Sequence, residues 1–177
     1  MTRKFLLDLK IKPEITLFVV VLILVTANTA ASMAACTDPA RPNVNWERCY
    51  MEERNLAGAN LQDAQLRDAR FNRATLERIN LSNSNAPRTK FISASMPKSI
   101  LDGAQMTGSD FTKADLRDAS LVGTDLRWAR LFRSNLRGSN LSQARMTGAD
   151  LLKADFSGAT WVDGKTICSE GSIGQCN

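Results

Sequence analysis

The 177-residue chain contains no histidine, and only 6% of its residues are aromatic. Histidine is the commonest general base and the commonest metal ligand, so its absence removes the usual starting point for an acid–base or metal site. The motifs H-E-x-x-H, G-x-x-x-x-G-K-[ST] and G-x-S-x-G are also missing, and the cysteines are not spaced as the CxxC pairs of a zinc site. We therefore expect a protein that is not an enzyme and that holds no cofactor or metal.

The sequence also lacks an apolar run long enough to span a membrane. The run from Ile15 to Val25 has eleven residues, whereas a spanning helix needs about 20. Basic residues precede this run, and small residues with two cleavage sites, Thr29-Ala30-Ala31 and Ser32-Met33-Ala34, follow it. Residues 1–35 are therefore predicted to be a signal peptide that exports the chain to a periplasm or thylakoid lumen. Two alternatives are an uncleaved N-terminal membrane anchor and lipidation of Cys36.

Cysteine is scarce, and its four copies lie on either side of the middle of the chain: Cys36 and Cys49, then Cys168 and Cys176. An even number of cysteines in an exported protein favours disulfides over a metal site. Four cysteines allow three pairings. We expect Cys36–Cys49 and Cys168–Cys176, because a rigid block between them would hold the two pairs apart. Lipidation of Cys36 would instead leave Cys49 unpaired.

The sequence is rich in a repeat of five residues that runs from Arg54 to Asp163. Stepping by five from Leu56 to Trp161 passes through thirteen Leu, four Phe, three Met, one Trp and one Ala. The residue two places before each of these positions is Ala, Ser or Thr in 20 of 22 cases. No insertion or deletion breaks the phase, so the repeat determines the fold.

A period of five fits neither of the common secondary structures. Each five-residue step on an α-helix turns about 140°, which would scatter the large residues around the surface, and on a flat strand alternate residues share a face. All seven glycines between Arg54 and Trp161 stand two residues after a large apolar position. A fixed place for glycine indicates a turn, so we expect the chain to turn a corner every five residues.

Units such as AGANLQDAQL, KADLRDASLVGTDL and TGADLLKADFSGAT resemble the pentapeptide-repeat family. The resemblance implies an all-β fold, a right-handed quadrilateral parallel β-helix with four pentapeptides to a coil. The 22 repeats of this solenoid would form about 5.5 coils. The chain then divides into an N-terminal cap at 36–53, the β-helix at 54–163 and a tail with a disulfide loop at 164–177. The W-x-x-C of the lead-in and the tail WVDGKTICSEGSIGQC are similar to the ends of exported bacterial members.

Residues 20 apart should stack in such a coil. Phe71, Phe91 and Phe111 have this spacing, and their rings would form an inner ladder with about 4.8 Å per step. Trp46 and Met51 already stand in the five-residue phase, so they are expected to begin the first coil and cover its end.

The weakest repeats lie at 84–100, where Ala86 underfills its position and two prolines follow core positions. We expect an irregular coil there; the alternative is a hinge or bulge that marks a site. Aspartates that precede core residues are expected to accept hydrogen bonds from turn backbone rather than to perform acid–base chemistry. These aspartates include Asp115, Asp125, Asp150 and Asp155.

Folding the sequence at 20 residues assigns the outward side chains to four faces. The face that includes Asn60 and Asn140 has no Lys or Arg, whereas the face two corners away is basic and is predicted to expose Ile92, Phe132 and Leu152. A basic strip with apolar side chains among its charges suits an anionic partner. The alternative is a solvated face that keeps the rod soluble. The candidate partner-binding residues are Arg70, Arg73, Lys90, Lys113, Trp128, Arg130, Phe132, Arg133 and Lys153.

The expected partner is a lipid headgroup, an acidic polysaccharide or an unknown protein, because export disfavours nucleic acid. The alternative function is that of a DNA mimic, since some pentapeptide-repeat proteins are acidic mimics that bind DNA gyrase, a topoisomerase. Removing four basic and two acidic residues with the first 35 leaves 19 basic and 16 acidic, which is the wrong sign for a mimic. The open β edges at the ends of a solenoid also invite a homodimer unless the disulfide loops cover them.

Overall fold

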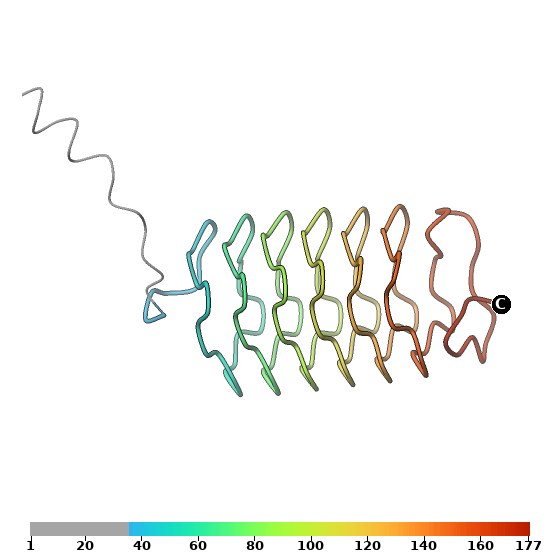
Figure 1. Ribbon diagram of the computed structural model, residues 1–177, viewed down its shortest axis with the longest axis horizontal. Helices are drawn as coiled ribbons and strands as arrows, with labels where there is room; N and C mark the ends of the chain where they lie inside the picture. Colours follow the sequence, from blue (N-terminus) through green and yellow to red (C-terminus); the bar gives the residue numbers. More distant parts are fainter. Residues whose placement is uncertain (1–35) are drawn as a thin grey trace, which may run out of the picture. The chain divides into compact units, whose positions relative to one another are not determined.

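The computed structural model describes residues 36–177, so the predicted signal peptide lies outside the described residues. In the described part the backbone forms neither helices nor extended strands, and no helix there could cross a membrane. Isolated parallel bridges join residues 20 apart, from Asn45↔Gln65 to Asn140↔Thr160. Figure 1 shows the result, a stack of similar coils. Four five-residue units therefore make one coil, in agreement with the predicted all-β solenoid.

Each unit is tied to its neighbours by the same backbone hydrogen bonds. The N–H of core residue Leu66 donates to Asn85 in the next coil at 2.8 Å, and the N–H of Asn85 donates back to Ala64 at 2.9 Å. The N–H of Ala69 closes the turn by donating to the carbonyl of Leu66 at 2.9 Å. Because buried backbone groups must be paired, this repeated pattern is what keeps the narrow coil closed.

Each corner is a turn whose third residue has a positive φ, as in a type II turn. Seventeen non-glycine residues and seven glycines occupy this position between Asn43 and Gly158, with φ from 53° to 74°. L-residues other than Asn and Asp adopt this conformation at a cost, which explains why glycine recurs at this place in the repeat.

Asp or Asn before a core residue completes the turn. The side-chain oxygens of Asp115, Asp125, Asp150 and Asp155 accept the backbone N–H two residues later at 3.2, 3.2, 3.1 and 3.0 Å. This N–H belongs to the second residue of the turn and donates no hydrogen bond to a backbone carbonyl. The prediction that these aspartates bond to turn backbone is confirmed.

The interior contains the predicted ladder of rings. The ring centroids of Phe71 and Phe91 are 5.3 Å apart, and those of Phe91 and Phe111 are 4.9 Å apart, with planes inclined by 8° in both pairs. All three rings are buried. A small residue beside each large one leaves room for this stack in a coil only one side chain wide.

The repeats at 84–100 are regular, so the expectation of an irregular coil or a hinge was wrong. Arg88 and Lys98 have φ of 56° and 58°, as at the other corners, and the bridges continue through the segment. Pro87 and Pro97 occupy the second position of their turns, which favours proline's fixed φ. Proline's missing N–H is the one that the repeat leaves without a backbone acceptor, so these prolines fit without disturbing the coil.

The regular pattern begins before residue 54, where the sequence places the start of the β-helix. Asn43 and Arg48 already have turn φ values of 59° and 58°. Trp46 and Met51 are buried in the first coil, as their phase predicts. A disulfide joins Cys36 to Cys49, with Cα atoms 5.4 Å apart, and ties the lead-in to this coil.

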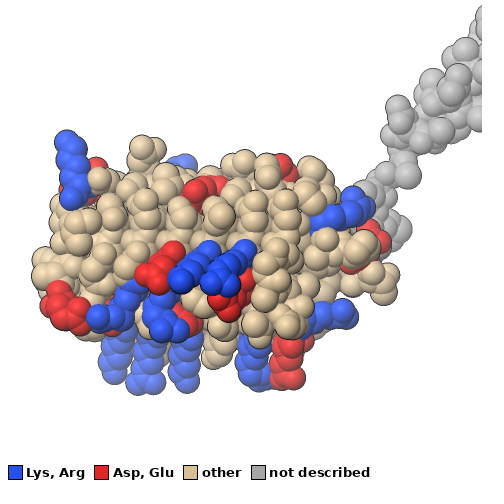
Figure 2. All heavy atoms as spheres, turned by 180° about the vertical axis from the view of Figure 1, so that it is seen from behind, with Lys and Arg blue, Asp and Glu red and all other residues tan. Residues whose placement is uncertain are grey.

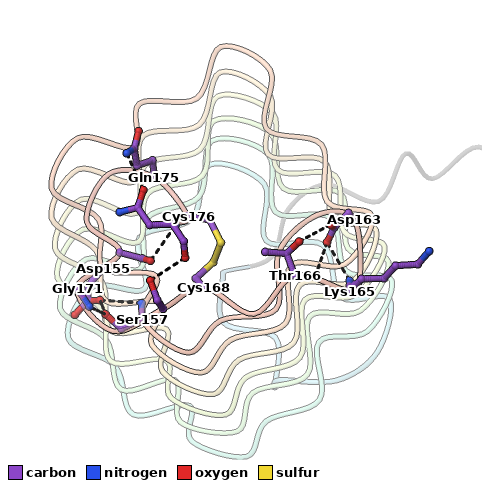
Figure 3. The surroundings of a disulfide bond; sticks show 12 residues. Asp155, Ser157, Asp163, Lys165, Thr166, Cys168, Gly171, Gln175 and Cys176 are labelled. Carbon is purple, nitrogen blue, oxygen red and sulfur yellow. Dashed lines mark hydrogen bonds between the residues drawn. A yellow bond between two sulfur atoms is a disulfide. The ribbon is translucent and has the colours of Figure 1, made fainter.

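The tail folds back on the last coil as an antiparallel partner. Bridges join Thr160 to Ile167 and Asp155 to Ile173. The Cys168–Cys176 disulfide, with a Cα separation of 4.9 Å, closes the loop that lies over this end (Figure 3). The tail therefore pairs part of the β edge that the last coil would otherwise expose.

Two carboxylates hold the tail in place. Asp163 accepts the Thr166 hydroxyl at 2.6 Å and the N–H groups of Lys165 and Thr166 at 3.0 and 2.9 Å. The hydroxyl bond, with the two N–H bonds, lowers the pKa of Asp163 to about 2. Glu170 accepts two hydrogen bonds from Arg137 at 2.8 and 2.9 Å, which lowers the pKa of Glu170 below its usual range.

Candidate interaction surface

Four of the candidate residues form a row along the rod, here called the turn row: Arg73, Lys113, Arg133 and Lys153. Each is the third residue of its turn, with φ from 56° to 60°. Lys113, Arg133 and Lys153 belong to consecutive coils, so the stacking distance between neighbours is about 4.8 Å. Figure 2 shows Lys and Arg side chains projecting side by side from one edge of the rod.

The charges of the turn row are largely uncompensated. Arg73 forms an ion pair with Glu53 at 2.6 Å. The Arg133 guanidinium lies 5.1 Å from the centre of the Phe132 ring, a contact that leaves its charge in place. Among residues 36–177, Lys113 and Lys153 have no acidic partner. Cations on neighbouring coils repel one another, and an anionic partner would relieve this repulsion.

A second line of residues, here called the bridge row, is less basic than the sequence analysis suggests. Arg70, Lys90 and Arg130 share it with Asp110 and Asp150. The Arg130 guanidinium pairs with Asp110 at 3.0 Å. Asp150 accepts the N–H of the residue two places later, and in the described part of the chain Lys90 has no ion pair. This row therefore presents charges of both signs.

The apolar residues of this face only partly match the prediction. Leu152 is 61% exposed, but Ile92 and Phe132 are half-buried. Phe132 supports the guanidinium of Arg133, and Arg70 likewise lies over Tyr50, 4.7 Å from its ring centre.

A groove of about 410 Å³ opens beside Trp128, at the corner next to the bridge row. Trp128 is 68% exposed, which is unusual for a residue with so large an apolar side chain. The charged residues that line the groove are Arg88, Lys90, Asp110, Arg130 and Asp150. The structure thus brings three of the predicted residues, Trp128, Lys90 and Arg130, to one concave site.

Glycines shape this groove. Arg88, Gly108, Trp128 and Gly148 occupy the same corner of consecutive coils, all with positive φ. A Cβ at Gly148 would collide with the Trp128 ring, so the ring leans over Gly148 and occupies the space that a side chain there would fill. Gly108 leaves the space between Arg88 and Trp128 without a side chain. The sequence signal for this groove is a column, at 20-residue spacing, in which one Trp stands between two glycines.

Arg88 lines the groove with its aliphatic stem rather than with its charge. Its guanidinium donates two hydrogen bonds of 2.8 Å to Asp68 in the preceding coil. These bonds lower the pKa of Asp68 below its usual range and keep the Arg88 charge turned away from Trp128. A Cβ at Gly108 would lie 3.6 Å from Cγ of Arg88, so the stem forms the far wall.

The arrangement suits binding. An exposed indole, a free ammonium group and carboxylates converge on an open concave surface, as in sites that orient a ligand. Among residues 36–177, no three His, Cys, Asp or Glu side chains are placed to hold a metal ion.

The family model of pentapeptide repeats matches eight copies of the repeat, at residues 43–73, 69–104, 90–127 and 124–160. The chain belongs to the pentapeptide repeat family. No curated protein sequence matches it significantly.

Solved pentapeptide repeat structures are similar to the chain. HetL, a pentapeptide repeat protein involved in heterocyst differentiation regulation in the cyanobacterium Nostoc sp. strain PCC 7120, is 28% identical, with a TM-score of 0.50. The match covers 72% of this chain and 66% of HetL, so the chain spans just under two-thirds of that protein. A thylakoid lumen protein of Arabidopsis thaliana is 23% identical over 62% of this chain and 69% of its own, with a TM-score of 0.38. QnrB1, a plasmid-mediated fluoroquinolone resistance protein, is 22% identical over 67% of this chain and 62% of its own, with a TM-score of 0.46. The HetL match supports the repeat fold, and none of these likenesses assigns a role to this chain.

Proposed function

We propose that this pentapeptide repeat protein is an exported, non-catalytic interaction module that binds an anionic partner through the turn row and the adjoining groove. The observation that carries the proposal is the line of Lys113, Arg133 and Lys153 on consecutive coils, in which neither Lys113 nor Lys153 forms an ion pair with a described residue. Cations stacked at this spacing destabilise the free protein slightly and favour association with an anion.

Export is supported by the two disulfides, one at each end of the described rod. Disulfides persist in oxidising compartments such as a periplasm. Together with the signal-like pattern of residues 1–35, they favour a periplasmic or lumenal location. We further propose the family's right-handed quadrilateral form with about 5.5 coils, on the basis of the 22 repeats.

Charge reversal with a matched control tests the proposal. Lys113→Glu/Lys153→Glu should strongly weaken binding of the protein to phosphatidylglycerol vesicles or to a polygalacturonate column, because it replaces two of three stacked cations. Lys98→Glu is the control, since Lys98 occupies the same turn position with φ of 58° on another face. Circular dichroism of all three proteins checks that the coil is intact. Equal binding by the double variant and the control would contradict the role of the turn row.

The alternative of a topoisomerase-binding DNA mimic receives no support from this surface. A mimic must present a line of negative charge, whereas the turn row presents a line of positive charge. Inhibition of DNA gyrase by the purified protein, undiminished by Lys113→Glu/Lys153→Glu, would reverse this preference.

A homodimer through the solenoid ends is also part of the proposal. Met146 and Leu151 of the last coil are only half-buried, whereas Leu126 and Leu131, one coil earlier, are fully buried. A second copy seated on this end would cover them. Analytical ultracentrifugation of the wild type and of Leu151→Lys should then show a dimer and a monomer respectively; two monomers would contradict it.

A further inference from the structure

We infer that the groove beside Trp128 is a binding subsite for an acidic sugar, and that the anionic partner is a carboxylated polysaccharide. This inference rests on the proposed function, because it names the class of anion that the basic face binds. It is argued from three features of the groove: the ring, the mixture of charges and the single free cation.

The exposed indole is the first feature. Trp128 projects from a strained turn position, and its ring leans over Gly148 so that it borders the space above Gly108. An aromatic face carries partial negative charge and attracts groups with partial positive charge. The C–H groups on one face of a pyranose ring are such groups. A sugar ring, which is apolar on one face and polar at its edge, therefore fits against the indole of Trp128.

The mixture of charges is the second feature, and it argues against a densely charged phosphate ligand. Asp110 and Asp150 both line the groove. Asp110 is neutralised by Arg130 at 3.0 Å, but Asp150 has no cationic partner among the described residues. A free carboxylate repels a phosphate group yet accepts hydrogen bonds from hydroxyl groups. This favours a ligand that carries many hydroxyls and few charges.

Lys90 is the third feature. It is the one cation of the groove lining that no described carboxylate neutralises, because Arg88 pairs with Asp68 and Arg130 pairs with Asp110. A single ammonium group suits a ligand with one negative charge per ring, such as a uronate. The turn row, on the next corner of the coil beyond the bridge row, then meets the carboxylates of further sugar units.

The substitution that removes the ring is safe for the fold. Gly108 and Gly148 occupy the same corner one coil before and one coil after Trp128. Trp128→Gly therefore introduces the residue that the neighbouring coils already have at this corner. Trp128→Phe keeps an aromatic face at the position and serves as the conservative variant. Of the other two tryptophans, Trp46 is buried and Trp161 is partly buried against Phe156, so the iodide quenching that Trp128→Gly removes is the part that reports on Trp128.

The experiment compares two carboxylate polymers, polygalacturonate, which has sugar rings, and polyacrylate, which has none. Trp128→Gly should weaken binding of polygalacturonate by about tenfold, the loss of one stacking contact, and leave polyacrylate binding unchanged. Trp128→Phe should recover most of the loss. Lys113→Glu/Lys153→Glu should weaken binding of both polymers. Polygalacturonate, but not polyacrylate, should protect the wild-type indole from iodide.

The opposite results distinguish failure of the sugar subsite from failure of the proposed function. Wild-type affinity of Trp128→Gly for polygalacturonate would overturn the sugar subsite and leave the proposed function standing. Binding of polyacrylate or phosphatidylglycerol vesicles without polygalacturonate would do the same. Tighter, Trp128-dependent binding of a single-stranded oligonucleotide would replace the sugar by a stacked base. Failure of the wild type to bind any of these probes would overturn the proposed function itself.

Discussion

The ladder of phenylalanine rings predicts that its middle member contributes more to stability than its end member. Phe91 has a stacked ring on each side, at 5.3 and 4.9 Å, whereas Phe111 has a stacked ring only on one side. A stacked pair contributes about 0.5–1.5 kcal/mol beyond the area that it buries. Phe91→Leu should therefore cost about 1–3 kcal/mol from stacking, and Phe111→Leu about half of that.

Comparing Phe91→Leu with Phe111→Leu removes the contributions to the unfolding free energy that the two variants share. Both side chains are fully buried, so the loss of apolar area and the cavity left by Leu are similar in the two variants. The difference between their free energies of unfolding isolates one ring pair. Urea titrations followed by circular dichroism in the far and near ultraviolet would measure it and would show whether unfolding is two-state. Equal losses in the two variants would refute the stacking argument and leave hydrophobic burial as the whole effect.

Three further predictions concern the tail and the turns. Replacing Cys168 and Cys176 by Ala removes a bond between positions 8 residues apart and should lower the free energy of unfolding by about 2.5 kcal/mol in a urea titration; no change would show that hydrogen bonds alone hold the tail. Because the pKa of Asp163 is lowered from 3.8 to about 2, its stabilising contribution is complete above the unfolded value and is lost as the pH falls through about 2. The Thr166 amide should therefore lose hydrogen-exchange protection between about pH 4 and pH 2 in the wild type, but should show no such transition in Asp163→Asn. Lys98→Gly relieves a positive φ of 58° and should raise the free energy of unfolding by about 1 kcal/mol; a loss of stability would mean that this turn is not strained.

Much of the fold could be predicted because residue types at fixed positions of the repeat indicate the backbone geometry. The place of glycine marks the positive-φ corner, and the spacing of Phe71, Phe91 and Phe111 gives the length of a coil. The regularity around Pro87 could not be predicted from the periodicity alone. It depends on which turn position lacks a backbone acceptor, a fact that appears only when the hydrogen bonds are assigned. The antiparallel pairing of Ile167 and Ile173 was likewise missed, because the tail has no repeat.

The candidate site was only partly predictable for a related reason. The sequence placed Trp128, Lys90 and Arg130 near one another, since position modulo 20 determines the face. It did not reveal which charges are compensated. The pairing of Arg130 with Asp110 and the turning of Arg88 toward Asp68 depend on side-chain conformations between coils. The groove itself depends on the direction in which one indole leans, and Gly148 leaves room for the ring in this direction.

Backbone strain at the third residue of each turn bears on where a functional surface lies on this solenoid. Glycine is the least strained residue at a positive φ, so a Lys, Arg or Trp there costs the protein about 1 kcal/mol or more. Strain alone does not mark a site, because Lys98 is strained as well. The row of Lys98 differs in its neighbours: Asp118 follows it one coil later, and Arg78, one coil earlier, pairs with Glu77 at 3.0 Å. The three cations from Lys113 to Lys153 are strained and also repel one another, two costs that folding does not require. Residues that carry both costs on consecutive coils, one corner away from an exposed Trp128 that is strained in the same way, support the proposal of a bound anion that offsets the repulsion.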